Sequence, residues 1–335
     1  MTRPEGHPFV PAPRIGVLLI NLGTPNAPEP GAVRLYLREF LTDPRVIEIP
    51  QLVWRPILHG IVLRTRPARS AHAYRQVWTD EGSPLAAITA RQAKALAGEF
   101  GDGVIVDHAM RYGRPAIRER IDALKAAGCE RILIAPLYPQ YCAATTATAN
   151  DEAFAHLRRL RWQPAIRTLP PYHDDPLYIG ALKSSVEAGL AELDFEPDAL
   201  LASFHGMPKR TLGLGDPYHC HCRKTARLLG EALGRDLLVA FQSRFGRAKW
   251  LEPATDSELA ALPGRGVRKL AIVAPGFSAD CLETLEELAI RGRAAFLAAG
   301  GTHFAYLPCL NDSAPGIEML LALIGRELEG WSPAP

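Results

Sequence analysis

Several features are scarce or missing in this chain of 335 residues. It holds only six cysteines, irregularly spaced, which excludes a disulfide-stapled scaffold and predicts free thiols in a reducing cytoplasm. It has no run of about 18 uncharged apolar residues, which excludes a spanning helix. The first 14 residues are Pro-rich and carry no apolar segment, so we expect no secretory signal and a cytoplasmic location.

A strong excess of one charge is also missing. Lys and Arg number 38 against 36 Asp and Glu, a net charge of +2, so we expect no nucleic-acid partner. No G-x-G-x-x-G follows the first apolar run, and no G-x-x-x-x-G-K-[ST] occurs, which argues against dinucleotide and P-loop sites. The segment at 276–280 (GFSAD) approaches a nucleophile elbow built on Ser278, but Asp280 replaces the final glycine, so a hydrolase is a distant alternative.

Short apolar runs alternate with longer helical patterns along the whole chain. This rhythm predicts parallel sheets covered by helices, and the length favours two units of about four strands each. The unit boundary is predicted after residue 138, giving domains 1–138 and 139–311 and a C-terminal helix in 312–335 that packs back on the first domain. The predicted strands are 15–20, 104–106, 132–135, 166–169, 200–203, 237–241, 270–274 and 304–307.

Polar residues follow most of these runs. In parallel α/β sheets, ligands bind outside the carboxyl ends of the strands, so these residues predict a cleft lined from several strands. His205 ends one run, and its imidazole there can act as a base or a metal ligand. A helical pattern covers 282–297, and if the helix starts at Asp280, then Asp280, Glu283 and Glu287 would share one of its faces. A capping box explains the first two acids but not Glu287, so both a helix cap and a cation path stay open.

Two further segments have alternative interpretations. The run at 219–222 (HCHC) resembles a metal cluster, but consecutive helical residues point around the axis, so a structural metal on Cys220 and Cys222 is the weaker hypothesis. Pro50–Arg66 mixes apolar residues with arginines. It reads either as a buried helix or as an exposed apolar lip that meets a flat hydrophobic ligand or a membrane surface.

Taken together, the motifs resemble the ferrochelatase family, enzymes that insert ferrous iron into a porphyrin. The resemblance spans nearly the whole chain and is closest to the proteobacterial type. It is carried by GVLLINLGTP at 16–25, YLREFLTDPRVI at 36–47, GSPL at 82–85, MRYG at 110–113, LYPQY at 137–141, SFHGMPKR at 203–210, GDPY at 215–218, FQSRFG at 241–246, WLEPATD at 250–256 and PGFSADCLETLEE at 275–287.

The resemblance implies two Rossmann-like, chelatase-type domains with the active-site cleft between them and a porphyrin-entrance lip at about 44–66. It implies His205 and Glu283 as the catalytic and metal-binding pair, with Glu287 and Asp280 as an outer relay for metal or protons. The substrate-binding positions that it implies are Arg111, Tyr112, Leu22, Tyr138, Ser243 and Trp250.

The implied substrates are Fe²⁺ and protoporphyrin IX, with two protons released in the terminal step of haem biosynthesis. Many members have His where this chain has Cys281, and some hold a [2Fe–2S] cluster on C-terminal cysteines. Because no cysteine follows Cys309, we expect no cluster and no permanently bound cofactor. We expect a monomer or weak homodimer, with peripheral contact to the inner face of a membrane through Pro50–Arg66.

Three questions stay open at this point. His205 can be the base and Glu283 the metal ligand, or the reverse. A related chelatase that loads cobalt or nickel into another tetrapyrrole is one alternative function. A porphyrin or haem carrier without turnover is the other.

Overall fold

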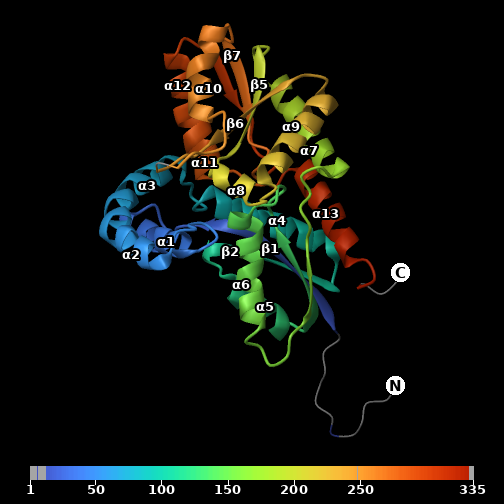
Figure 1. The fold of residues 1–335 in the computed structure, drawn as a ribbon. Helices are drawn as coiled ribbons and strands as arrows, with labels where there is room; N and C mark the ends of the chain where they lie inside the picture. The colour runs from blue at the N-terminus through green and yellow to red at the C-terminus, as the bar shows by residue number, and fades with distance from the viewer. Residues whose placement is uncertain (1–5, 7–12, 247, 332–335) are drawn as a thin grey trace.

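The computed structural model of the chain describes residues 6, 13–246 and 248–331 (Figure 1). Within them lie two four-stranded parallel sheets, with strand orders β2-β1-β3-β4 and β6-β5-β7-β8. Each of the eight predicted runs overlaps a strand, three of them by all but their last residue, and the two-sheet prediction is confirmed. The strands are β1 (Arg14–Thr24), β2 (Val104–Gly113), β3 (Cys129–Pro136), β4 (Ala165–Thr168), β5 (Ala199–His205), β6 (Leu237–Gln242), β7 (Lys269–Val273) and β8 (His303–Tyr306).

Helices cover both faces of each sheet and form the bulge at the left of Figure 1. The earlier helices are α1 (Pro30–Thr42), α2 (Gln51–Ile57), the π-helix η1 (Leu58–Val62), α3 (Leu63–Val77), α4 (Pro84–Phe100), α5 (Ile117–Ala126), the π-helix η2 (Ala143–Ala147) and α6 (Thr148–Leu157). The later ones are α7 (Pro176–Ala191), α8 (Lys209–Gly213), α9 (Tyr218–Leu233), α10 (Thr255–Ala261), the 3₁₀ turn η3 (Leu262–Arg265), α11 (Leu282–Thr284), the π-helix η4 (Leu285–Gly292), α12 (Arg293–Ala298) and α13 (Ala314–Leu328).

The first sheet extends beyond the boundary predicted after residue 138. β4 pairs in parallel with β3, from Arg131 opposite Ala165 to Ile134 opposite Thr168. The chain therefore returns to the first sheet after α6, and the second sheet begins with β5. The prediction placed the boundary too early because β4 is a short edge strand whose apolar signal is weak.

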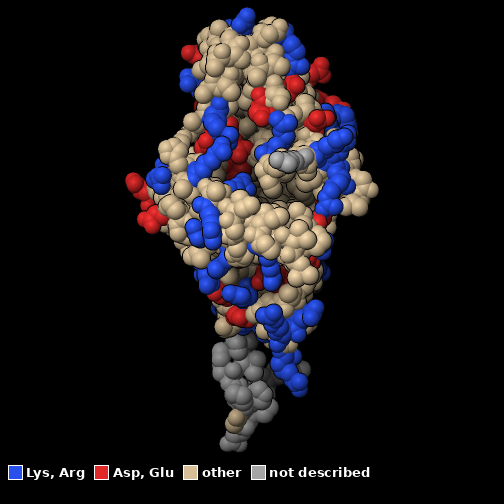
Figure 2. All heavy atoms as spheres, turned by 60° about the vertical axis from the view of Figure 1, so that its left-hand side comes forward, with Lys and Arg blue, Asp and Glu red and all other residues tan. Residues whose placement is uncertain are grey.

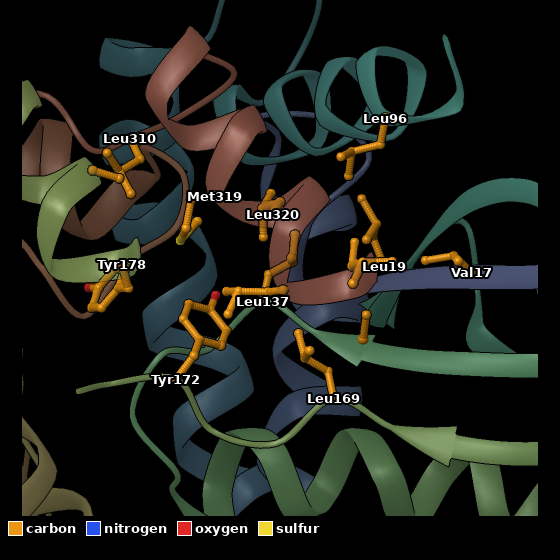
Figure 3. Packing of buried hydrophobic residues seen from close by; sticks show 14 of the residues in the cluster. Val17, Leu19, Leu96, Leu137, Leu169, Tyr172, Tyr178, Leu310, Met319 and Leu320 are labelled. Carbon is orange, nitrogen blue, oxygen red and sulfur yellow. The ribbon is translucent and has the colours of Figure 1, made fainter. Parts of the chain in front are cut away.

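β1 lies inside the first sheet and is buried on both faces. Successive side chains of a strand point to opposite faces, so Val17 and Leu19 contact one apolar cluster while Leu18 and Ile20 contact another. The first cluster also includes residues of α4, α7 and α13, among them Met319 (Figure 3). α13 thus packs against α4 and β3 on one side and α7 on the other.

Candidate active site

The predicted cleft lies at the carboxyl ends of the strands of both sheets. Its cavity volume is about 140 Å³, and it opens to solvent. The last residues of β1 and residues that follow β3, β5 and β7 line it, as the strand-end rule predicts. Its lining includes Leu22, Gly23, Tyr36, Phe40, Tyr74, Leu85, Tyr138, Gln140, His205, Met207, Tyr218, Phe245, Trp250, Phe277, Ser278 and Glu283.

His205 is the last residue of β5 and lies opposite Gln242 of β6. Its Nδ1 is 2.7 Å from the carbonyl oxygen of Gly206. Because a carbonyl only accepts hydrogen bonds, Nδ1 carries the proton and Nε2 keeps its lone pair. A Cβ atom at Gly206 would lie 2.6 Å from the carbonyl oxygen of Gln242, so this close approach of β5 and β6 requires glycine.

Glu283 enters the cleft from α11, and the acidic line continues into η4. The predicted helix over 282–297 is present, but residues 285–292 form a π-helix instead of α-helical turns. Glu287 sits one turn beyond Glu283. Its Oε2 accepts a 2.5 Å hydrogen bond from Ser243, and its Oε1 lies 3.4 Å from Arg291 Nη2.

Burial and nearby charges shift the pKa of Glu287. Burial raises this pKa above its usual range, the hydrogen bond from Ser243 lowers it, and the charge of Glu283 raises it. A protonated His205 lowers it as well. The charges of Glu283 and His205 thus both act on the Glu287 carboxyl group.

Asp280 does not line the cleft. It is buried behind α11, where its carboxylate accepts hydrogen bonds from Thr284, Tyr306 and Asn311. The structure thus separates Asp280 from Glu283 and Glu287, although the three were predicted to share a helix face. The α-helix begins only at Leu282, so Asp280 precedes its N-cap and is free to bind these distant partners.

Arg111 and Tyr112 also lie outside the cleft lining. Arg111 Nη2 donates to Asp43 Oδ2 at 2.6 Å, and the Tyr112 hydroxyl donates to the same oxygen at 2.8 Å. Thr148 donates to it as well. Asp43 is buried and accepts these hydrogen bonds. The geometry therefore gives Arg111 and Tyr112 a structural role and does not present either side chain to a ligand in the cleft.

The other substrate positions divide into two groups. Leu22, Tyr138 and Trp250 line the cleft, whereas Ser243 bonds Glu287 beside it. Sequence reasoning missed two wall residues, Tyr36 of α1 and Tyr74 of α3. Burial raises the pKa of both phenols well above the usual value, and the charge of Glu283 raises them further, so both stay neutral beside that carboxylate. The only sequence signal for Tyr36 and Tyr74 is an aromatic residue at helical spacing. The same spacing is expected for an aromatic residue that packs in the core.

The two competing motifs do not form sites among the described residues. Cys222 is buried, Cys220 is exposed, and His221 stacks on His173 with ring centroids 3.6 Å apart, so the HCHC side chains diverge as a helix requires. In residues 6, 13–246 and 248–331, no three His, Cys, Asp or Glu side chains converge to hold a metal. Ser278 Oγ is buried without a hydrogen-bond partner in the described chain, so it lacks the base of a hydrolase nucleophile.

The Pro50–Arg66 segment combines both of its predicted readings. Trp54 and Leu58 are buried in the cluster beneath it, while Leu52 is 92% exposed and Val53 and Ile61 are also exposed. This face comes forward in Figure 2, where Lys and Arg lie around a broad area without charge. Among the described residues, no helix is both long and apolar enough to span a bilayer.

Comparison with known proteins shows what this chain is similar to. Solved structures share the fold at low identity: SirB from Bacillus subtilis with Fe³⁺ matches with a TM-score of 0.56 and 14% identity, over 95% of this chain and 96% of that one. The sirohydrochlorin chelatase SirB from Bacillus subtilis subspecies spizizenii, in complex with cobalt, matches with a TM-score of 0.54 and 10% identity, over 95% and 98%. These matches define the class of fold, a pair of four-stranded parallel sheets covered by helices.

Sequence relatives then identify the family. The chain is 53% identical over 335 residues to the ferrochelatase of Agrobacterium fabrum, covering 98% of this chain and 97% of that one. It is 55% identical over 332 residues to that of Rhizobium meliloti, covering 97% and 98%. The family model described as Ferrochelatase matches residues 14–328. The chain belongs to the ferrochelatase family, lyases that insert ferrous iron into protoporphyrin in haem biosynthesis.

Proposed function

We propose that ferrous iron enters protoporphyrin IX in the cleft between the two sheets, with His205 and Glu283 as the reacting pair. The observation that supports this most is the position of the two groups. Both line one apolar cavity, and His205 Nε2 carries a lone pair because Nδ1 is bonded to Gly206. The cavity walls are aromatic and aliphatic, which suits the faces of a flat tetrapyrrole.

The reaction makes two demands on the chain. Two pyrrole N–H protons must leave, and one dehydrated ferrous ion must take their place between the four nitrogens. A planar ring hides its nitrogen lone pairs in the ring plane, so a cleft that holds the ring bent favours the transition state through contacts remote from the nitrogens. Leu22, Trp250 and Tyr36 lie in position to grip the ring faces.

His205 accepts a pyrrole proton at Nε2 in this proposal. Imidazole gains and loses a proton near neutral pH, and the Gly206 carbonyl stabilises the resulting cation by accepting from Nδ1–H. Glu283, with Glu287 behind it, receives the ferrous ion or the second pyrrole proton on the other side, because carboxylate oxygens can bind a cation or accept a proton. The reverse assignment, with Glu283 as base and His205 as iron ligand, makes different kinetic predictions.

The test is anaerobic insertion of Fe²⁺ into protoporphyrin IX, followed by the Soret shift. In our assignment His205→Ala loses at least about 100-fold in kcat, within the range typical for a general base. Glu283→Gln raises the KM for Fe²⁺ and lowers kcat. The matched control is Glu286→Gln, on the same helix but bonded to Arg291 and outside the cleft, which keeps turnover within about twofold. Porphyrin binding without turnover in the wild type would favour the carrier.

The exposed side of the lip suggests a second partner. Leu52, Val53 and Ile61 form an exposed apolar edge, and Arg55, Arg64 and Arg66 stand among them. Apolar residues flanked by cations suit the headgroup boundary of an anionic bilayer. Co-sedimentation with phosphatidylglycerol vesicles tests this. Leu52→Glu combined with Val53→Glu abolishes binding, whereas Leu214→Glu, at an exposed leucine outside the lip, leaves it unchanged. Equal binding by both variants would contradict the lip as the contact.

A further inference from the structure

Asn311 joins three segments of the chain behind the cleft. It lies between β8 and α13 and has a φ of 51°, in the left-handed region that asparagine tolerates better than most side chains. Its backbone N–H donates to the carbonyl oxygen of Ser278 at 3.1 Å. Its own carbonyl oxygen accepts 2.8 Å from Gln92 Nε2, which comes from α4. A specific backbone conformation is therefore held at Asn311 by partners on both sides.

The Asn311 side chain makes a two-pronged contact with Asp280. Its Oδ1 accepts from the Asp280 N–H at 2.7 Å, and its Nδ2 donates to Asp280 Oδ2 at 2.6 Å. Both the main chain and the carboxylate of Asp280 are thereby fixed by one amide. Only asparagine or glutamine carries such a donor and acceptor together, and glutamine is longer by one methylene.

The contact continues from Asp280 into the start of α11. The other carboxylate oxygen, Oδ1, accepts from Thr284 Oγ at 2.8 Å and from the Tyr306 hydroxyl at 2.5 Å. Thr284 Oγ in turn accepts from the Cys281 N–H at 3.0 Å. Thr284 is the residue after Glu283, so the first turn of α11 is anchored through Asp280 to Asn311. On the opposite side, Gln242 Nε2 holds the Glu283 carbonyl at 2.7 Å.

We infer that Asn311 is a positioning residue for Glu283, acting through Asp280. Asp280 is the anchor of α11 in this arrangement, because its carboxylate is buried and bonded to three neutral donors rather than open to the cleft. This inference rests on the role proposed for Glu283. A misplacement of about 1 Å in a reacting group can cost 100-fold in rate, so the anchor has a measurable effect.

The variant that isolates the amide is Asn311→Gly. Glycine keeps the positive φ without strain and removes both side-chain hydrogen bonds, whereas alanine would add backbone strain. We expect kcat for Fe²⁺ insertion to fall at least about 10-fold while the KM for protoporphyrin stays within about twofold. The matched control is Asp312→Asn, which weakens the 2.8 Å ion pair to Arg91 in the same loop but does not touch Asp280, and keeps kcat within about twofold.

A double-variant cycle separates positioning from general loss of stability. Single-turnover rates are measured for wild type, Asn311→Gly, Glu283→Gln and the combination, with porphyrin fluorescence titrations to show that each folds. If Asn311 acts through Glu283, its loss has no further effect once Glu283 is Gln. The inference would be overturned if the effects of the two substitutions on the single-turnover rate multiply in the double variant. An unchanged rate in Asn311→Gly alone would overturn it as well. Full turnover in Glu283→Gln alone would instead reject the proposed role of Glu283, and this inference with it.

Discussion

Gln242 and Glu283 are joined by a hydrogen bond of 2.7 Å from Gln242 Nε2 to the Glu283 carbonyl. Gln242 is also the strand partner of His205, so one residue lies beside both members of the proposed reacting pair. Its Oε1 accepts from Ser203 Oγ at 2.7 Å, which fixes the orientation of the amide. The two groups are thus held by a common element at the end of the second sheet.

Gln242→Leu is expected to impair both stability and turnover. The change leaves the Glu283 carbonyl without this partner, at a cost of about 1–3 kcal/mol for an unsatisfied group, while the Ser203 hydroxyl keeps its hydrogen bond with Thr255. We expect kcat to fall about 10-fold or more with a lower Tm. Gln163→Leu, which breaks a bond to Leu157 away from the cleft, is the control and keeps kcat. Equal kcat in both variants would argue against a link through Gln242.

The acid limb of the pH–rate profile is expected to depend on Ser243. Burial already raises the pKa of Glu287, and Ser243 opposes that shift by bonding the charged form. Ser243→Ala removes the opposing bond, so the pKa of Glu287 rises. If metal transfer needs the charged carboxylate, the acid limb of kcat/KM moves to higher pH. Profiles of both proteins from pH 5 to 8 measure this, and a limb that stays in place or moves down contradicts the metal path through Glu287.

Asp43 is expected to be a structural residue in spite of its place in the motif at 36–47. Asp43→Ala leaves the guanidinium of Arg111 partly buried without its partner, which costs about 3–5 kcal/mol. Asp151→Ala is the comparison, because it breaks an ion pair with Arg45 that is about half exposed and costs no more than about 1 kcal/mol. Urea unfolding of both variants checks the difference, and similar losses would mean that the Asp43 cluster is not a buried ion pair.

Acid is expected to destabilise the protein through the stacked imidazoles of His173 and His221. Burial, the neighbouring His221 charge and the charge of Lys224 lower the pKa of His173 from 6.5 to about 4, and only attraction from Asp174 opposes this shift. Below pH 6.5 the unfolded chain takes up a proton that the folded chain refuses, so stability is lost as the pH falls toward 4.

His173→Phe keeps a flat ring on His221 and removes this titration. The variant should lose less Tm than the wild type between pH 7 and pH 5, whereas His72→Phe, at an exposed histidine, should follow the wild type. Thermal melts in matched ionic strength make the comparison. A wild-type slope in His173→Phe would mean that other groups control the acid limb.

The sequence predicts the two sheets and the pair His205 and Glu283 better than it predicts the residues around that pair. Apolar runs such as 15–20 are buried on both faces, a condition that leaves a strong local signal, and strand ends then locate His205 and Gly276. Tyr36 and Tyr74 were missed because they reach the cleft from helices, and nothing local to α1 or α3 states which face meets a ligand.

Other differences have tertiary causes. Arg111 is drawn to Asp43, 68 positions earlier, and such a pairing has no signature in local spacing. Asp280 turns away from Glu283 because Asn311, 31 positions later, binds it. The π-helix η4 replaces the expected α-helical turns around Glu287, and helical periodicity alone does not distinguish the two geometries. The β4 edge strand is too short for its sheet to be assigned from its sequence.

The position of α13 has a consequence for the order of events during synthesis. Met319, Leu320 and Leu323 complete the apolar cluster on one face of the first sheet, although they are made some 300 residues after β1 begins. A ribosome-bound chain therefore leaves part of this apolar sheet face uncovered until α13 has been made. The nascent chain needs protection from aggregation during that interval.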